Sequence, residues 1–356
     1  MLAPNEFVRG RYLIVQQIGS GATGGVYEAL DMETRLHIAL KQIAGAGAVQ
    51  ASAGGSFERE VRALLVLRHP ALPVVSDVFV EDDSMFLVME FVPGDDLATL
   101  LARNGGPFTT VQALRWADQL LDVLDYLHTR QPPSLHRDIK PQNLKLTPRG
   151  KIMLLDFGLA KAGWPAAQEK QAGGVRVSSL QFLPPEQVAG AGADARSDLF
   201  ALAATLYYLL TGELPALAGR RANAAARGLP DPLRPIHEVN PQVPAPVSAV
   251  LMQALALDPA QRPASAAEMR VAIERASASP LVLAATLAPT QPLAPPAPEA
   301  ATVPLQPTDQ LPIASLPSAP PPPTIEVTPS APMPATPAPV PAPARSRWRI
   351  PAIAGG

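Results

Sequence analysis

Residues 135–158 contain two motifs, Leu135-His136-Arg137-Asp138-Ile139-Lys140-Pro141-Gln142-Asn143 and, after a short strand-like run, Asp156-Phe157-Gly158. Their polar side chains have the spacing that phosphoryl transfer needs. Asp138 can accept the proton of an attacking hydroxyl, while Asn143 and Asp156 can hold the Mg²⁺ that bridges nucleotide phosphates. An isolated Asp-Phe-Gly recurs by chance, but the two motifs in this order, about a hairpin apart, form a specific signature.

A glycine-rich stretch lies upstream, between two predicted strands. Residues 12–17 read as the first strand, and Gly19-Ser20-Gly21-Ala22-Thr23-Gly24-Gly25-Val26 then fits the pattern G-x-G-x-x-G-x-V. Glycine lets the backbone approach phosphates closely. Dinucleotide-binding folds share this pattern, but there it opens a helix, whereas here residues 26–30 read as a second strand. The stretch therefore favours a phosphate-binding hairpin.

The next predicted strand, residues 36–43, contains Ile38-Ala39-Leu40-Lys41, which is close to the V-A-I-K pattern and predicts that Lys41 contacts the α- and β-phosphates. A helix is predicted over residues 56–67, with Ser56 as its N-cap. Glu60 is the carboxylate that we expect to hold Lys41, because it lies one turn before the apolar Leu64. The alternative is that Glu60 is a solvated charge, since Glu58 is also available.

Residues 8–275 resemble the eukaryotic-like Ser/Thr protein kinases of bacteria. Pro184-Pro185-Glu186 is similar to the Ala-Pro-Glu motif of that family, and Arg262 matches the arginine that pairs with its glutamate. Asp198 matches the buried aspartate that anchors the catalytic loop. Lys140, two residues after Asp138, is the lysine that the family uses to stabilise charge on the transferred phosphoryl group.

The resemblance also implies a nucleotide pocket. Val26 and Ala39 would cover adenine, Met89 would guard a back pocket, and residues 90–92 would form the hinge. Asp96 would reach the ribose, although the adjacent Asp95 is an alternative. The nucleotide-binding residues predicted in this way are Ile18, Gly19, Ser20, Gly21, Ala22, Thr23, Gly24, Gly25, Val26, Ala39, Lys41, Met89, Glu90, Val92 and Asp96.

Lys145 departs from the family pattern, because its position usually offers an apolar floor to adenine. We expect the methylene stem of Lys145 to pack there, with its ammonium directed to water.

The activation segment, residues 156–186, holds Ser178 and Ser179 but has no Thr or Tyr between Leu159 and Leu183. Ser179 aligns with the hydroxyl residue that contacts Asp138 and Lys140 in the family. Ser178 is then the predicted phosphosite, with Arg137 as the cationic partner of a phosphoserine. The alternative is that both serines are structural.

Composition sets limits on this interpretation. The chain has 356 residues and a net charge of −2, which gives no electrostatic case for nucleic-acid binding. It has no cysteine, and its first residues lack the pattern of a signal peptide. We expect an α+β, two-lobed protein-kinase fold over residues 8–276. Its N-lobe, residues 8–89, would be an antiparallel sheet plus one helix, and its C-lobe, residues 90–276, would be mainly helical.

Residues 277–344 are rich in Pro and Ala and poor in aromatic side chains, which predicts a disordered linker. Residues 345–356 contain Arg345-Ser346-Arg347-Trp348-Arg349 before an apolar run. This basic tip resembles the cytoplasmic flank of a transmembrane helix. One hypothesis is therefore a cytoplasmic kinase domain from a longer, membrane-anchored chain, and the other is a complete soluble kinase with a basic tip.

The expected function is transfer of the ATP γ-phosphoryl group to Ser or Thr hydroxyls of protein substrates, in signalling and with autophosphorylation. ATP and Mg²⁺ are the expected cofactors. No nucleic-acid partner is expected, and membrane attachment and a homodimer are two open hypotheses. The competing class is a pseudokinase or scaffold. The sequence argues against it, since none of Lys41, Asp138 and Asp156 is substituted.

Overall fold

The computed structural model describes residues 2–21, 24–44, 63–82, 84–156 and 177–278. The linker predicted from residue 277 and the basic tip at 345–356 therefore lie outside the described residues, apart from residues 277 and 278. The same holds for Glu60, Ala22, Thr23 and most of the helix predicted over 56–67. Of that helix, only the end is described, and it stops at Leu64 rather than at Leu67.

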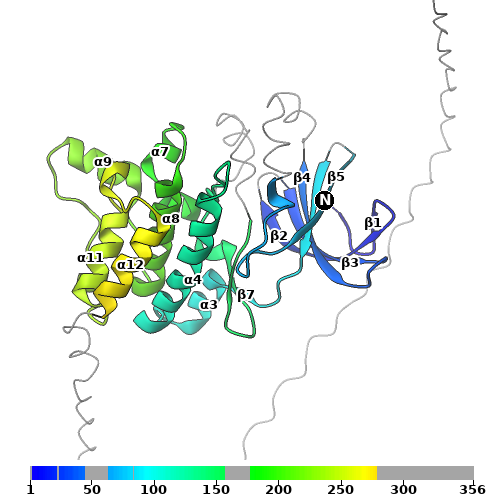
Figure 1. Ribbon diagram of the computed structural model, residues 1–356, viewed down its shortest axis with the longest axis horizontal. Helices are drawn as coiled ribbons and strands as arrows, with labels where there is room; N and C mark the ends of the chain where they lie inside the picture. Colours follow the sequence, from blue (N-terminus) through cyan, green and yellow to red (C-terminus); the bar gives the residue numbers. More distant parts are fainter. Residues whose placement is uncertain (1, 22–23, 45–62, 83, 157–176, 279–356) are drawn as a thin grey trace, which may run out of the picture. The chain divides into compact units, whose positions relative to one another are not determined.

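The N-lobe is built on a six-stranded antiparallel sheet with the order β1-β2-β3-β4-β6-β5 (Figure 1). Its strands are β1 (Phe7–Val8), β2 (Tyr12–Gly21), β3 (Gly24–Asp31), β4 (His37–Ala44), β5 (Val75–Glu81) and β6 (Ser84–Glu90). The three strands predicted over 12–17, 26–30 and 36–43 are confirmed, and the first two run further toward each other than the sequence pattern indicated.

Alternation along the strands explains why they pair in this way. In β3 the side chains of Tyr27 and Ala29 are fully buried against Ile14 and Leu40 of the neighbouring strands, in a small core of the N-lobe. The residues between them point to the opposite face, because successive side chains of a strand alternate. Val26 therefore faces away from Tyr27, on the side of the sheet that also carries Lys41, its register partner on β4.

The C-lobe is mainly helical. Its helices are α3 (Leu97–Asn104), α4 (Thr110–His128), α7 (Pro185–Val188), α8 (Ala195–Thr211), α9 (Ala218–Ala226), α10 (Ile236–Val239), α11 (Ala245–Ala254) and α12 (Ala266–Ser277). Figure 1 shows α4, α8, α11 and α12 gathered into one bundle. The part of the chain described here contains no helix with the length and apolar character of a membrane span.

Helix α8 forms the centre of this lobe, because it is apolar around nearly its whole circumference and almost every residue in it is buried. Its C-cap is Gly212, which has a φ of 73° and donates its N–H to the Tyr208 carbonyl. At the other end the N-cap is Asp194, whose carboxylate accepts from the N–H groups of Arg196 and Ser197. Asp198, in the first turn of α8, is therefore not the residue that caps this helix.

A small three-stranded sheet lies next to the site residues along the chain. Its order is β7-β8-β9, with β7 (Asp95–Asp96), β8 (Leu144–Leu146) and β9 (Ile152–Leu154). The 3-10 turn η1 (Pro141–Asn143) immediately precedes β8. The loop that holds Asp138 therefore runs into β8, and the β8–β9 hairpin brings the chain back to Asp156.

Candidate active site

The loop from His136 to Asn143 places two polar side chains against the carboxylate of Asp138. Oδ2 of Asp138 accepts from Nζ of Lys140 at 2.8 Å and from Nδ2 of Asn143 at 2.9 Å. Nδ2 of Asn143 also donates to the backbone carbonyl of Asp138 at 2.7 Å. The carboxylate of Asp138 is thus oriented by a cation and an amide, which is the arrangement that a positioned general base requires.

Asp198 holds the backbone of this loop. Its two carboxylate oxygens accept from the N–H groups of His136 at 2.8 Å and of Arg137 at 2.7 Å, and Nε2 of His128 donates to it at 2.9 Å. Burial opposes ionisation of Asp198, but these hydrogen bonds and the neighbouring histidines outweigh it and lower the pKa of this carboxyl. The loop is therefore tied to helix α8, in the core of the C-lobe.

Two further contacts fix the loop relative to the β9 strand. Nε2 of His136 donates to the carbonyl of Leu155 at 3.0 Å, and the N–H of Leu155 donates to the carbonyl of Asn143 at 2.8 Å. The ring of His136 is fully buried, and that burial lowers its pKa. A neutral ring with its proton on Nε2 is consistent with both observations.

Arg137 and Asp156 adopt left-handed backbone conformations, with φ of 64° and 59°. Such φ values are uncommon outside glycine and cluster at functional sites.

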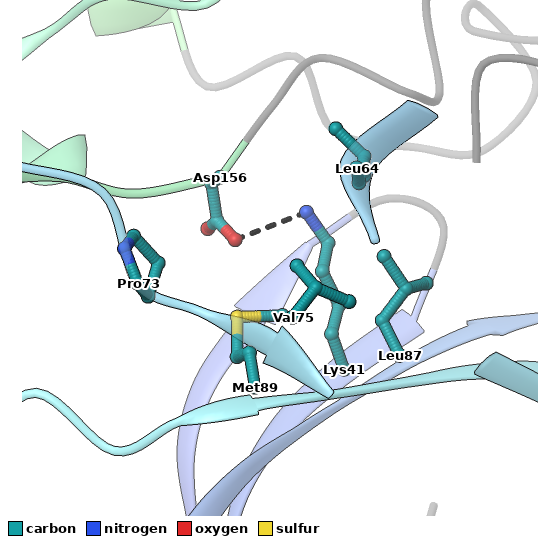
Figure 2. Close-up of a pocket in the computed structure, with 7 residues that line it drawn as sticks. All are labelled: Lys41, Leu64, Pro73, Val75, Leu87, Met89 and Asp156. Atoms are coloured by element: carbon teal, nitrogen blue, oxygen red, sulfur yellow. Dashed lines mark hydrogen bonds and ion pairs between the residues drawn. The ribbon is translucent and has the colours of Figure 1, made fainter. Parts of the chain in front are cut away.

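Lys41 extends from β4 and meets Asp156. Its Nζ donates to Oδ1 of Asp156 at 3.0 Å, and Figure 2 shows this contact as a dashed line. The side chains are 19% and 35% exposed. A small cavity of about 20 Å³ lies beside the pair, lined also by Leu64, Pro73, Val75, Leu87 and Met89. Asp156 is thus a partner of Lys41 here, whereas the partner predicted from the sequence, Glu60, lies outside the described residues.

The glycine-rich stretch forms the predicted hairpin. Gly19 pairs with Val26, and Gly21 pairs with Gly24, so β2 and β3 stay paired up to the turn after a register shift between Gln17 and Gly19. Gly24 has a φ of 150°, and a Cβ there would lie 2.0 Å from the carbonyl oxygen of Gln42. No other residue fits at this point, because the hairpin lies directly against β4.

The segment between β6 and β7 contains the predicted hinge. Met89 is 9% exposed and lines the cavity, and Val92 is buried. Asp96 is the N-cap of α3, since its carboxylate accepts from the N–H and the hydroxyl of Thr99 at 2.9 and 2.7 Å. Asp95 is paired with Arg103 instead. Contact of Asp96 with a ribose would therefore share a carboxylate that also caps a helix.

The structure differs from expectation at Lys145. Its ammonium is not directed to water: Nζ donates to the carbonyl of Val92 at 2.7 Å and lies 5.5 Å from the centre of the Phe91 ring. Burial lowers the pKa of Lys145, although Asp96, Asp95 and Glu28 act in the opposite direction. The sequence showed that Lys145 departs from the family pattern, but it did not predict the Val92 carbonyl as its partner.

Glu186 and Arg262 form a two-point ion pair, with distances of 2.7 and 3.0 Å. Ser197 adds a hydrogen bond from its hydroxyl to Glu186 at 2.7 Å. Burial of Glu186 would raise its pKa, but the hydrogen bonds from Arg262 and Ser197 prevail and lower it. Sequence reasoning missed Ser197, which lies one position before Asp198 and occupies the N3 position that a capping box uses.

The serines of the activation segment are only partly located. Ser178 and Ser179 belong to the 3-10 turn η2 (Val177–Phe182), and residues 157–176 lie outside the described residues. Their predicted roles stay predictions.

The described donors fit Mg²⁺. This ion prefers oxygen ligands. Nδ2 of Asn143 is committed to Asp138, so the amide oxygen is the atom that Asn143 can offer to a cation. Asp156 supplies a carboxylate on the adjoining strand end. Asn143 and Asp156 would therefore hold the metal, which would supply neutralisation of phosphate charge when bound.

A profile of the protein kinase domain matches residues 12–272, which is most of the chain. The chain belongs to the protein kinase family. Its relatives include the probable serine/threonine-protein kinase SCO3848 of Streptomyces coelicolor, which is 32% identical over 269 residues, a match that covers 74% of this chain and 40% of the relative. The serine/threonine-protein kinase PrkC of Bacillus subtilis is 32% identical over 269 residues, covering 76% and 41%.

The fold is similar to solved structures of the family. The crystal structure of the Mycobacterium tuberculosis PknI kinase domain matches with a TM-score of 0.60 and 29% identity, covering 78% of this chain and 100% of that one. The predicted two-lobed protein kinase fold and the resemblance to bacterial Ser/Thr kinases are thereby confirmed. The match spans only about two fifths of the length of SCO3848 and PrkC, at 40% and 41%.

Proposed function

We propose that this kinase-family chain transfers the γ-phosphoryl group of Mg²⁺-bound ATP to Ser or Thr hydroxyls of proteins, including its own. The observation that carries the proposal is the carboxylate of Asp138. Lys140 and Asn143 orient it at 2.8 and 2.9 Å, on a loop whose backbone is fixed by Asp198. A base held in this way can accept a hydroxyl proton as the phosphoryl group leaves ATP.

Each remaining residue has a distinct task in the proposed reaction. Lys140 lies beside Asp138 and would stabilise charge on the transferring group. Lys41 would hold the α- and β-phosphates, with Glu60 as its partner, and Asn143 and Asp156 would hold Mg²⁺. The glycine-rich hairpin would cover the phosphates with its backbone N–H groups, and residues 89–92 with Asp96 would bind adenine and ribose. Protein kinases of this kind act in signalling, and that is the role we propose here.

The relatives support the choice of hydroxyl acceptor, because SCO3848 and PrkC both bear the name serine/threonine-protein kinase. The site itself also supports a Ser or Thr acceptor, because Lys140, two residues after Asp138, matches the lysine of the Ser/Thr kinases. Substrate proteins, membrane attachment and a homodimer remain hypotheses.

The direct test is incubation of purified protein with γ-labelled ATP and a basic model substrate, with Mg²⁺ or with a chelator. We expect label on Ser or Thr of the protein and of the substrate, lost when the chelator is present. The matched control is Asp82→Asn, an amide-for-carboxylate change in the exposed turn between β5 and β6, which should keep full activity. Label that persists with the chelator, or none under any condition, would count against the proposal.

A further inference from the structure

Lys145 lies where strand alternation directs it toward the hinge. Leu144, its neighbour on β8, is fully buried in the large core of the protein. Successive residues of a strand point to opposite faces, so Lys145 faces away from that core. Its stem then runs from β8 to the segment between β6 and β7, and its ammonium donates to the Val92 carbonyl at 2.7 Å.

Gly94 explains why the lysine can reach that carbonyl. It has a φ of 108°, and a Cβ at this position would lie 2.2 Å from the carbonyl oxygen of Leu146. The segment that follows the hinge therefore lies directly against β8, and strand pairing continues from there, with Asp96 opposite Lys145. The close approach of the two backbone segments thus puts the Val92 carbonyl within reach of the Lys145 side chain.

Several groups surround the ammonium of Lys145. Val92 is 5% exposed, so its carbonyl needs a protein donor or a ligand donor. The carboxylates of Asp95, Asp96 and Glu28 lie close enough to interact electrostatically with the Lys145 ammonium. Glu28 is itself fixed, since Gln16 donates to it at 2.7 Å. The ring of Phe91 adds a face over which the ammonium lies.

This cation has a consequence for the base of the nucleotide. The base pose assumed in the proposed function directs the 6-amino group to the Glu90 carbonyl and N1 to the Val92 N–H. In that pose, position 2 of the purine points toward the Val92 carbonyl. Adenine carries only hydrogen at position 2. A 2-amino group would have to share that carbonyl with the ammonium of Lys145, which donates to it at 2.7 Å, so two sets of N–H donors would crowd one acceptor.

We propose that Lys145 is a specificity-determining residue of the nucleotide site, which disfavours purines with a 2-amino group because its ammonium engages the hinge carbonyl of Val92. The proposal rests on the proposed function, since it requires a nucleotide with its base against the hinge. It adds a residue at a position where the family pattern has an apolar side chain.

The test is equilibrium binding of ATP and of 2-amino-ATP, each with Mg²⁺, measured by calorimetry on the full chain. The two nucleotides differ only at position 2, so the ratio of their dissociation constants cancels general effects of a substitution on affinity. We expect the wild type to bind 2-amino-ATP more weakly than ATP. In Lys145→Met the ratio should shift by about tenfold toward 2-amino-ATP, as expected for one hydrogen bond gained and one charged neighbour removed.

Lys151→Met is the matched control, because Lys151 is exposed on the same β8–β9 hairpin and loses the same charge. It should keep the wild-type ratio. Wild-type protein that binds 2-amino-ATP as tightly as ATP would overturn the proposal without any variant, and so would the same ratio in wild type and Lys145→Met. Protein that binds neither nucleotide would instead overturn the proposed function, and this inference with it.

Discussion

The two sides of the candidate site are held in different ways. On the C-lobe side, Asp198 has a side chain only 1% exposed and accepts three hydrogen bonds, two of them from the backbone of the loop that carries Asp138. On the N-lobe side, Lys41 meets Asp156 in a single ion pair whose partners are 19% and 35% exposed. The first anchor is buried in the core, and the second lies in a cleft that water reaches.

This difference separates positioning from binding. A buried carboxylate that satisfies backbone donors costs much to remove, so the loop and its base keep one geometry before substrate arrives. An accessible ion pair contributes little to folding. Breaking the pair therefore costs little free energy when Lys41 binds phosphate and Asp156 binds the metal. The comparison therefore predicts that substitutions on the two sides affect stability and activity in different proportions.

The largest effect is expected from Asp198→Ala. It would leave two buried N–H groups and a buried histidine without their acceptor, and we expect unfolding to become easier by about 3–5 kcal/mol, with activity lost as well. Asp156→Ala should cost less than about 1 kcal/mol. Urea unfolding of both variants measures this contrast. Equal losses of stability in Asp198→Ala and Asp156→Ala would contradict the view that only the C-lobe side of the site supports the fold.

Acid should weaken the contacts of two buried or partly buried carboxylates. The pKa values of Asp198 and Glu186 are both lowered in the folded protein, from ordinary values of 3.8 and 4.5. Groups of this kind bind fewer protons folded than unfolded, so their stabilisation is present above the ordinary values and is lost as pH falls through the lowered ones. The free energy of unfolding, measured from pH 6 downward, should decrease in that window.

Glu186→Gln sharpens this expectation, because it removes one of the two titrating groups. The variant should be less stable at neutral pH and should lose less stability on acidification than the wild type. A wild-type protein that becomes more stable as the pH falls below 4 would show that the direction of these shifts is wrong.

Lys41→Met tests the other side of the comparison. Stability should change by less than about 1 kcal/mol, because the pair is accessible to solvent. Phosphoryl transfer should fall by at least about a hundredfold, because the phosphates lose their positioned cation. The measurements are a melting curve and a labelled-ATP assay on the same preparation. A strongly destabilised variant would show that this pair also supports the fold.

The smallest effect on stability is expected at the predicted partner of Lys41. Glu60→Gln should lower activity by loosening Lys41, with almost no change in melting temperature, and Glu58→Gln should do less. Steady-state kinetics of the two variants decide between the carboxylates. A larger loss in Glu58→Gln would mean that the register predicted for residues 56–67 is wrong.

Much of the fold could be predicted because local patterns and long-range packing agree. The glycine-rich stretch between two strand-like runs became the β2–β3 hairpin, and the strand predicted over residues 36–43 became β4. Asp138, Asn143 and Asp156 lie close together, since η1 leads directly into the short β8–β9 hairpin.

What could not be predicted depends on contacts between distant segments. Lys145 was expected to reach water, but the close approach of Gly94 to β8 puts a carbonyl within its reach. The pairing of Lys41 with Asp156 joins residues 115 positions apart, and no periodicity signals it. Both cases concern where a long, flexible side chain finds its partner, which sequence patterns do not encode.

The central claim is that Asp138 acts on the hydroxyl of the substrate and contributes little to binding or folding. Asp138→Asn tests it most directly, with Mg²⁺-ATP affinity and phosphoryl transfer measured on one preparation. We predict a dissociation constant within about threefold of wild type and a melting temperature nearly unchanged, with transfer reduced by about 10²–10⁴. Near wild-type transfer by the folded, nucleotide-binding variant would contradict the assignment.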